Sequence, residues 1–523
     1  MNYRILLLLL LGLVSACAGQ RRSQASAQEA HRPAFHFTPE NMWMNDPNGM
    51  VWYEGEYHLF YQYHPYSTVW GPMHWGHAVS RDLVHWQHLP IALYPDSLGM
   101  IFSGSAVIDW NNTSGFGEKG RPPMVAVFTQ HDMAGEKAGR QDFQTQGIAY
   151  STDRGRSWTK YTGNPVIPNP GIRDFRDPKV VRDEASGQWV LVMAAGDHVR
   201  LYGSKDLRKW QYLSDFGREW GAHGGVWECP DLFPMQVEGT GEKKWVLLQS
   251  LNPGSPNGGS GTQYFVGNFD GRQFTLDPDF AASLKKNDRA FWVDYGRDNY
   301  AGVTWSDVPA SDGRRIFLGW MSNWDYAQTV PTKRWRSAMT LPRELTLQRG
   351  PEGLRLYARP AREVAKLRKR HVELAAQTLL PTLDLTPKLG FSPCTSELLL
   401  EFEQPAAGTT DLAVVLANTK GERYRVGYDA LKNEWYSDRR QAGDSSFSYA
   451  FATQRHVAPR SPNTRTVQLH LFFDRASCEL FADGGAVALT DIFFPAEDFS
   501  RLSIETEGGS IRLLKGEVWE LKP

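Results

Sequence analysis

A short polar turn that ends in an aromatic residue recurs through the first half of the chain. The segment SRDLVHW at residues 80–86 is echoed by SKDLRKW at 204–210, more loosely by STDRGRSW at 151–158 and weakly by NFDGRQF at 268–274. A strand-like run precedes each turn. Strand-built repeats roughly 50 to 70 residues apart are typical of β-propellers, in which each blade reuses one hairpin. Over residues 35 to 350 this spacing predicts about five blades, with a set of unrelated hairpins as the alternative.

The second half of the chain has a different residue pattern. After residues 341–345, Ala, Arg, Glu, Lys and Leu follow a helical pattern over residues 357–374, which predicts a partly helical linker at 351–375. Residues 376–523 carry several short alternating runs with turns between them, which favours a β-sandwich. We therefore expect an all-β chain, a five-bladed β-propeller followed by a C-terminal β-sandwich.

The first 17 residues are typical of an export signal. A charged start is followed by an apolar run at residues 5–14 that is too short to span a bilayer. Small residues directly before Cys17 resemble the lipobox of bacterial lipoproteins, which implies cleavage before Cys17 and lipidation of its thiol. The alternative is an ordinary secretory signal cleaved after Ala16 or Ala18. We expect an exported, membrane-anchored bacterial lipoprotein, periplasmic or on the cell surface, with residues 18–34 as a flexible tether.

Charge and cysteine content narrow the function classes. The net charge of -1 provides no basic field for nucleic acid, whereas 19 Trp, 20 Tyr and 26 Phe offer flat apolar faces suited to sugar rings. Cys229, Cys394 and Cys478 form neither a disulfide framework nor a zinc pattern, so buried free thiols are expected and a Cys394–Cys478 bridge stays open. His74 and His77 lack a zinc partner set, and no metal is expected.

Three acidic residues are each followed closely by proline and surrounded by aromatic residues. They are Asp46 in WMNDPNG (43–49), Asp177 in RDFRDP (173–178) and Glu228 in WECPDLF (227–233). One such segment alone could be a surface turn. Because the innermost strands of a propeller converge on an axial funnel, three acids that each begin an inner strand would meet there. The sequence therefore predicts one carboxylate-lined sugar pocket.

Two carboxyl groups suffice to cleave a glycosidic bond with retention, when they lie about 5 to 5.5 Å apart. Asp46, in a tight turn with amide donors, suits the ionised nucleophile. Glu228 suits the proton donor, since neighbouring anions and partial burial favour its protonated form. Asp177, which follows Arg176, suits binding of sugar hydroxyls as positive charge develops on the ring. A salt-bridged turn is the alternative for Asp177.

With these motifs in order, the chain resembles glycoside hydrolase family 32, the β-fructosidases that include invertases, inulinases and levanases. The resemblance rests on WMNDPNG (43–49), FSGS (102–105), RDP (176–178), ECPD (228–231), GWM (319–321) and TLPREL (340–345), and it reaches LFADGG (480–485). It implies a five-bladed propeller with a sandwich and the three roles given above. It also implies a fructosyl subsite lined by Asn45, Gln62, Trp70, Phe102, Ser103, Arg176 and Trp320, beside the aromatic wall of Trp43. Trp70 and Trp320 could equally be core residues.

The sequence thus indicates a retaining, exo-acting glycoside hydrolase that releases fructose from the non-reducing end of levan, inulin or sucrose-type substrates and needs no cofactor. The alternatives within the family are an endo-acting fructanase and a fructosyltransferase. A related propeller hydrolase acting on arabinosides or xylosides, or a non-catalytic fructan-binding lipoprotein, would share the carboxylate trio.

Overall fold

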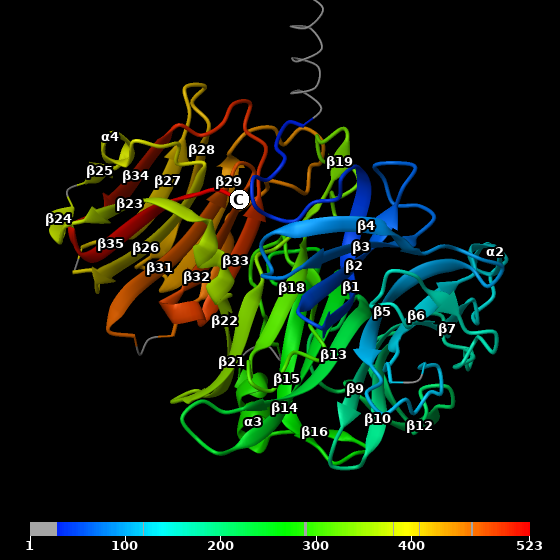
Figure 1. The fold of residues 1–523 in the computed structure, drawn as a ribbon. Coiled ribbons are helices and arrows are strands. Elements are labelled where there is room, and N and C mark those ends of the chain that lie inside the picture. Colours follow the sequence, from blue (N-terminus) through cyan, green and yellow to red (C-terminus); the bar gives the residue numbers. More distant parts are fainter. Residues whose placement is uncertain (1–28, 119, 287–289, 380, 407, 462–463) are drawn as a thin grey trace, which may run out of the picture.

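The computed structural model describes residues 29–118, 120–286, 290–379, 381–406, 408–461 and 464–523. Figure 1 shows two β-rich bodies side by side, a larger one built from the first two thirds of the chain and a smaller one built from the rest. Helical segments among the described residues are short: α2 (Met133–Lys137), α3 (Pro278–Lys286) and α4 (Thr386–Leu389). The Cys17 prediction and the export signal lie outside the described residues.

The larger body is a propeller of five antiparallel sheets within the described residues, which confirms the predicted architecture. Its first strands contact one another in the order β1, β5, β9, β13, β17 and back to β1, so they form a closed ring around the axis. The blades are β1 (Met42–Tyr53), β2 (Glu56–His64), β3 (His74–Ser80) and β4 (Trp86–Leu93); β5 (Met100–Ile108), β6 (Met124–His131), β7 (Gln144–Ser151) and β8 (Thr159–Lys160); β9 (Phe175–Asp183), β10 (Gln188–Ala195), β11 (Val199–Ser204) and β12 (Gln211–Phe216); β13 (Val226–Gln236), β14 (Lys243–Asn252), β15 (Gly261–Phe269) and β16 (Phe274–Leu276); β17 (Tyr300–Thr304), β18 (Arg315–Met321), β21 (Arg343–Gly350) and β22 (Gly353–Pro360).

Two short strands extend these sheets. β19 (Trp335–Arg336) pairs in parallel with the start of β1, and β20 (Ala338–Met339) pairs with β18. A segment between the second and third strands of the fifth blade is therefore hydrogen-bonded to the first blade. This pairing helps to close the ring.

The recurring polar turn joins the third and fourth strands of a blade. Between β3 and β4, the Asp82 carboxylate accepts a hydrogen bond from the amide of His85 (3.0 Å), and Trp86 donates its indole N–H to the carbonyl of Leu83 (3.0 Å). Asp206 and Trp210 make the matching bonds between β11 and β12. The repeat seen in the sequence is thus one hairpin turn reused in successive blades, with its aspartate satisfying backbone donors.

The smaller body is a sandwich of two antiparallel sheets, again as predicted. Apolar side chains of both sheets fill the space between them, including Leu398, Val414, Trp435 and Leu480. One sheet comprises β23 (Arg368–Leu374), β35 (Ile511–Leu521), β26 (Thr395–Glu403), β31 (Thr466–Asp474), β32 (Ser477–Ala482) and β33 (Val487–Ile492), with β24 (Gln377–Leu379) paired to β35. The other comprises β25 (Thr382–Asp384), β34 (Arg501–Glu507), β27 (Asp411–Ala417), β28 (Arg423–Asp429), β29 (Glu434–Gln441) and β30 (His456–Pro459).

The expected linker at 351–375 is mostly strand. β22 pairs along its length with β21, so the fifth blade continues past residue 350 to Pro360, and β23 already belongs to the sandwich. Between them lies the 3-10 helix η1 (Arg362–Leu367). The last residues of the tether expected at 18–34 make contacts of their own. Arg32 donates to Thr38, and the Ala34 amide donates to the Asp474 carboxylate (2.7 Å). Residues 32–34 therefore pack on the folded body.

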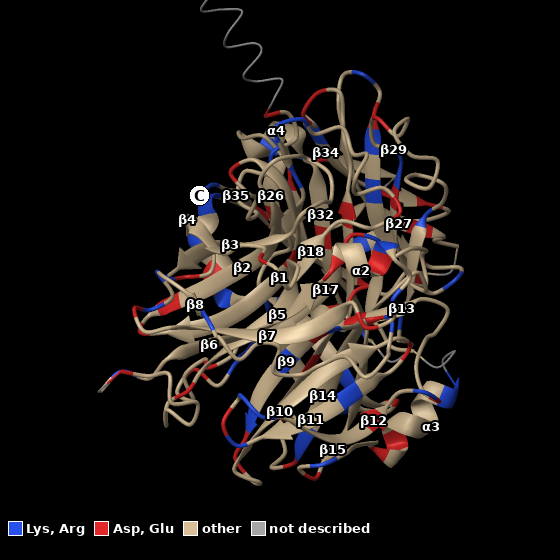
Figure 2. Ribbon diagram, turned by 90° about the vertical axis from the view of Figure 1, so that its right-hand side faces the viewer, with Lys and Arg blue, Asp and Glu red and all other residues tan. Residues whose placement is uncertain are grey.

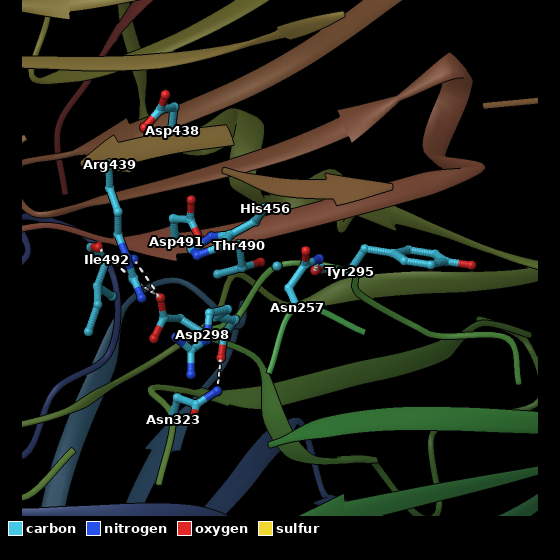
Figure 3. A network of polar contacts seen from close by, with 12 residues as sticks. Asn257, Tyr295, Asp298, Asn323, Asp438, Arg439, His456, Thr490, Asp491 and Ile492 are labelled. Atoms are coloured by element: carbon cyan, nitrogen blue, oxygen red, sulfur yellow. Dashed lines mark hydrogen bonds and ion pairs between the residues drawn. The ribbon is translucent and has the colours of Figure 1, made fainter. Parts of the chain in front are cut away.

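Buried ion pairs join the two bodies, and Figure 3 shows part of this network. Arg343, from the propeller, donates to Asp294 (2.8 Å), to Glu479 (2.5 Å) and to Thr490 (2.7 Å), the last two on the sandwich. Arg439 of β29 donates to Asp298 of the propeller (2.6 Å). Each of these guanidinium groups is excluded from solvent and paired with carboxylate, so the interface fixes the sandwich against the propeller.

The three cysteines of the described residues are buried free thiols, so no disulfide joins Cys394 to Cys478. In the part of the chain that the structure describes, no helix is long and apolar enough to cross a membrane.

Candidate active site

The five inner strands all depart from regular pairing at the same level of the propeller axis. In each, two residues oppose a single residue of the neighbouring strand, which is the arrangement of a β-bulge. The bulged pairs are residues 45–46 of β1, 102–103 of β5, 177–178 of β9, 229–230 of β13 and 301–302 of β17. Bulges re-aim side chains, and bulge residues of β1, β5 and β9 line the axial cavity.

The acid–proline motifs belong to three of these bulges. Proline has no amide hydrogen to contribute to a ladder, and a bulge tolerates that loss. Asp177 and Cys229 have positive φ angles of 65° and 47°, a left-handed conformation that costs free energy for residues with a side chain. Pro178 and Pro230 follow them directly. The sequence pattern that predicted turns therefore marks bulges inside strands.

Asp46 lies at the base of the cavity, held by three donors. Ser103 donates to its Oδ2 atom (2.6 Å), Asn45 donates to Oδ1 (3.1 Å), and the thiol of Cys229 lies 3.4 Å from Oδ2. Burial raises the pKa of Asp46 and the negative charge of Glu228 raises it further, whereas the three donors lower it. The donors fix the carboxylate in one orientation and partly offset its desolvation.

Asp177 contacts the same thiol as Asp46 does. Its Oδ2 atom accepts the backbone amide of Cys229 (3.0 Å) and lies 3.6 Å from the Cys229 sulfur, while its own amide donates to Thr129 (2.9 Å). Burial raises the pKa of Asp177 to about 7; the charges of Glu228 and Asp46 add to this effect and Arg176 opposes it. Cys229 thus bridges two carboxylates, and burial keeps its own pKa well above the ordinary value, so it remains a neutral thiol.

Glu228 is held by a cation and a phenol. Arg176 donates from Nε (3.2 Å) and Nη2 (3.0 Å) to Oε1, and the hydroxyl of Tyr300 donates to Oε2. Arg176 also donates to Asp174 (2.7 Å). Burial disfavours the charge of Arg176, but the carboxylates of Glu228, Asp177 and Asp174 outweigh it and raise the pKa of the guanidinium. The neighbours expected around Glu228 were anions; the structure adds this arginine.

These residues line one cavity of about 270 Å³. Its described walls carry five carboxylates and a single arginine, with aromatic side chains at the sides. The lining residues are Asn45, Asp46, Gln62, Trp70, Phe102, Ser103, His131, Glu136, Phe143, Gln144, Asp174, Arg176, Asp177, Glu228, Trp324 and Gln328. Such a combination of flat apolar faces with convergent hydrogen-bonding groups suits a neutral sugar ring.

Two residues predicted to contact the substrate lie behind the cavity wall. Trp43 and Trp320 are fully buried, with ring centroids 6.1 Å apart, and Trp43 donates its indole N–H to Asn45 (2.7 Å). Trp320 lies in β18, the second strand of its blade, so inner strand β17 stands between it and the axis. Both therefore support the wall, and Trp324 beside them reaches the cavity.

Several lining residues were not predicted. Trp324 and Gln328 lie in the connection after β18, and His131 and Glu136 lie at the end of β6 and in α2, where no proline-linked acid marks the segment. Asp174 could have been predicted from the sequence, since it stands two residues before Arg176 in the same motif. In the described parts of the chain, no group of three or more His, Cys, Asp or Glu side chains is arranged to hold a metal ion.

Comparisons with known proteins agree with this geometry. Residues 36–360 match the glycosyl hydrolases family 32 N-terminal domain, and residues 363–520 match the glycosyl hydrolases family 32 C-terminal domain. The chain is 46% identical over 520 residues to a levanase from Bacillus subtilis, covering 99% of this chain and 74% of the levanase. It is 37% identical over 532 residues to an extracellular exo-inulinase from Aspergillus niger, covering 97% and 98%. The structure of a fructofuranosidase from Schwanniomyces occidentalis complexed with fructosylnystose superposes with a TM-score of 0.84 at 33% identity, covering 95% and 99%.

Proposed function

This chain belongs to glycosyl hydrolases family 32, and we propose that it is a retaining, exo-acting β-fructosidase that releases fructose from the non-reducing end of fructans and sucrose-type substrates. The observation that carries the proposal is the convergence of Asp46, Asp177 and Glu228, from three different blades, on one small polar cavity. The names of the relatives, levanase and exo-inulinase, support β-fructosides over arabinosides and xylosides.

Two of the carboxyl groups carry the covalent chemistry. Asp46 attacks the anomeric carbon of the terminal fructosyl unit while Glu228 gives a proton to the departing glycosidic oxygen. The fructosyl unit is then esterified to Asp46. Glu228, now ionised, takes a proton from water as the water attacks the same carbon, which frees fructose and regenerates both groups. The orientation of Asp46 by Ser103 and Asn45 supports its role as nucleophile.

Asp177 stabilises the transition state. As the glycosidic bond breaks, positive charge develops on the sugar ring, and hydrogen bonds from ring hydroxyls to an ionised carboxylate strengthen. The contact of Asp177 with the Cys229 amide holds it in place for this purpose. Gln62, Trp70, Phe102 and Arg176 line the same cavity and bind the fructosyl unit, together with Trp324.

Cavity size supports attack at a chain end. A volume of about 270 Å³ lies just below the roughly 300 Å³ at which ligand pockets of drug-sized molecules begin. A terminal unit needs only such a pocket, whereas an internal segment of a polymer needs a groove that is open at both ends. The cavity therefore favours exo over endo cleavage.

A time course of products from sucrose, inulin and levan tests the proposal, using purified enzyme that lacks residues 1–17. Fructose alone from the earliest times is the expected result. A ladder of oligosaccharides would mean endo cleavage or fructosyl transfer, and no product from any of the three would refute the β-fructosidase assignment. The Glu228→Gln variant, run in parallel, should release no fructose while keeping its fold.

The protein is also proposed to be exported and anchored through lipidated Cys17. Extracellular location of the exo-inulinase relative supports export, and the small residues before Cys17 support lipidation. Expressed in a bacterium, the full chain should partition into the membrane fraction and release into the soluble fraction on Cys17→Ser substitution. Equal partitioning of both forms would refute the anchor and leave the enzymatic proposal untouched.

A further inference from the structure

A second cavity lies on the sandwich, on the sheet face turned away from the sandwich core. Its volume is about 630 Å³, against about 270 Å³ for the active site. The lining residues are Thr410, Asp411, Arg423, Arg425, Asp429, Leu431, Tyr436, Asp438, Arg440, Gln441, Arg455 and Glu507. Figure 2 shows basic and acidic segments close together around β29 and β27.

Strand register explains why this face is hollow. Ala413 of β27 lies opposite Gly427 of β28, which in turn lies opposite Tyr436 of β29. Ala413 and Gly427 therefore leave the middle of the sheet almost without side-chain bulk, and the Tyr436 ring lies at the end of their row. The adjacent rows carry long charged side chains on the same face, Asp429 in one and Arg425 in the other, and these form the walls.

One part of the wall is internally satisfied. The Oδ2 atom of Asp411 accepts hydrogen bonds from the hydroxyl of Tyr436 (2.8 Å) and from Arg425 (2.8 Å). Burial raises the pKa of Asp411, although both donors oppose that effect. These contacts make a fixed base for the cavity.

Arg455 provides the unsatisfied part. Its guanidinium lies 3.5 Å from the centroid of the Tyr436 ring, which holds it flat across the cavity. It stands 3.8 Å from the Oδ1 atom of Asp411 and 3.6 Å from the Oδ2 atom of Asp429, too far for direct hydrogen bonds. Its Nε and Nη2 atoms are buried without a hydrogen-bond partner in the structure. The Arg455 side chain, 30% exposed, thus lies beside two carboxylates without a direct hydrogen bond to either.

The chemistry of the lining selects the class of ligand. Four arginines and four carboxylates line the cavity, so its formal charge is balanced and neither an anion nor a cation is favoured. A hydroxyl group accepts a hydrogen bond from a guanidinium and donates one to a carboxylate, so neighbouring hydroxyls satisfy both partners of such a pair at once. A neutral molecule with several adjacent hydroxyls fits this requirement.

We propose that this cavity is a non-catalytic saccharide-binding site that holds a fructosyl unit of the same polymer that the active site degrades. The identity of the sugar rests on the proposed function; the site itself rests on Arg455, Asp411 and Asp429. A second attachment point raises the effective concentration of chain ends near the active site. It therefore acts on polymers and leaves short substrates unaffected.

Electrophoresis through native gels containing levan or inulin, compared with gels lacking polysaccharide, tests the site. The background is Glu228→Gln, so that the polymer is not consumed. Migration should be retarded by polymer, and Arg455→Ala should weaken binding roughly tenfold, as expected for loss of one set of charge-assisted hydrogen bonds. Asp429→Asn, which keeps side-chain size, should weaken it in the same direction. The control is Arg512→Ala, which removes an exposed arginine from the other sheet of the sandwich.

Kinetics separate this site from the active site. With Glu228 intact, Arg455→Ala and Asp429→Asn should raise KM for levan or inulin and leave kcat/KM for sucrose unchanged. Equal retardation of these variants and of the Arg512→Ala control would overturn the second site while fructose release still supported the enzyme. If the wild-type chain released no fructose from any substrate, the proposed function would fail first. Even in that case, a retardation by polymer that is lost in the Arg455→Ala variant would support a saccharide site.

Discussion

Two regions of this molecule bury charge, and they treat it in opposite ways. At the junction of propeller and sandwich, Arg343 meets Asp294 and Glu479, and Arg439 meets Asp298, so carboxylates and guanidinium groups are matched. In the catalytic cavity, five carboxylates share one arginine. The first arrangement joins the two domains, and the second gives the cavity lining more carboxylates than guanidinium groups.

The pKa of Glu479 shows this difference, although burial raises the pKa of Asp298 at the junction in spite of Arg439. Burial alone would raise the pKa of Glu479, but Arg343 and His36 outweigh it, and the pKa falls below the ordinary value. For Asp46 and Asp177, burial and neighbouring anions prevail, and both pKa values rise. Burial of Asp46 and Asp177 therefore costs stability. Their raised pKa values are typical of groups that take part in catalysis.

Replacing Asp46 by Asn should have the largest effect, a loss of activity without a loss of stability. The variant loses the nucleophile, so kcat should fall by roughly 10⁴-fold or more. Unfolding should be no easier than in the wild type, because a buried anion has been removed. Fructose release and urea denaturation measure the two effects. A variant that kept more than a hundredth of the activity, or that unfolded far more easily, would contradict this division of roles.

Replacing Arg343 by Met should lower the stability of the fold. It strands Asp294 and Glu479 as buried anions, and such a loss costs about 3 to 5 kcal/mol of unfolding free energy. Urea denaturation of the purified variant measures it, with Arg334→Met as control because that side chain is 56% exposed. A loss below about 1 kcal/mol, the value expected of an exposed pair, would mean that the junction is not where the stability lies.

Stability should also depend on pH through His36, which lies between Asp474 and Glu479. Burial lowers the pKa of His36, but hydrogen bonds to the two carboxylates outweigh it and raise the pKa to about 9 from 6.5. Because the folded pKa is the higher one, the contribution is complete below pH 6.5 and is lost as pH rises to about 9. The loss should reach about 3 kcal/mol. Urea denaturation across this range should show the decline, and His36→Gln should flatten it; an equal slope in both proteins would exclude His36 as its source.

The smallest expected effect comes from removing one hydrogen bond to Asp46 inside the cavity. Ser103→Ala removes a donor that lowers the pKa of Asp46, so the acid limb of the kcat/KM profile should move to higher pH. The lost bond to a charged group should reduce kcat/KM by roughly 10- to 100-fold. Ser105→Ala is the matched control on the same strand, since its hydroxyl bonds to backbone atoms of residues 178 and 180. An acid limb that moved equally in both variants would exclude a specific effect of Ser103 on Asp46.

Local signals in the sequence were enough to predict the blades and the three acids. The turn around Asp82 and Trp86 is made by neighbouring residues, so its repetition reported the architecture directly. The acid–proline pairs marked bulges, because proline is excluded from regular ladders. Each of these features depends on contacts within a few residues.

Features that depend on distant contacts were missed. Arg343 and Glu479 are 136 residues apart, and nothing near either one indicates the other. Trp43 was expected at the substrate, and its side chain is buried, where it donates to Asn45 of the cavity lining. Trp324 reaches the cavity from a connection without a recognisable pattern.

The five bulges have a consequence for how such a site changes over time. Three of them supply residues to the cavity lining: Asn45 and Asp46 in β1, Phe102 and Ser103 in β5, and Asp177 in β9. An alteration in one blade therefore reshapes one wall and leaves the others in register. Selection, natural or in the laboratory, can therefore change the catalytic centre one blade at a time.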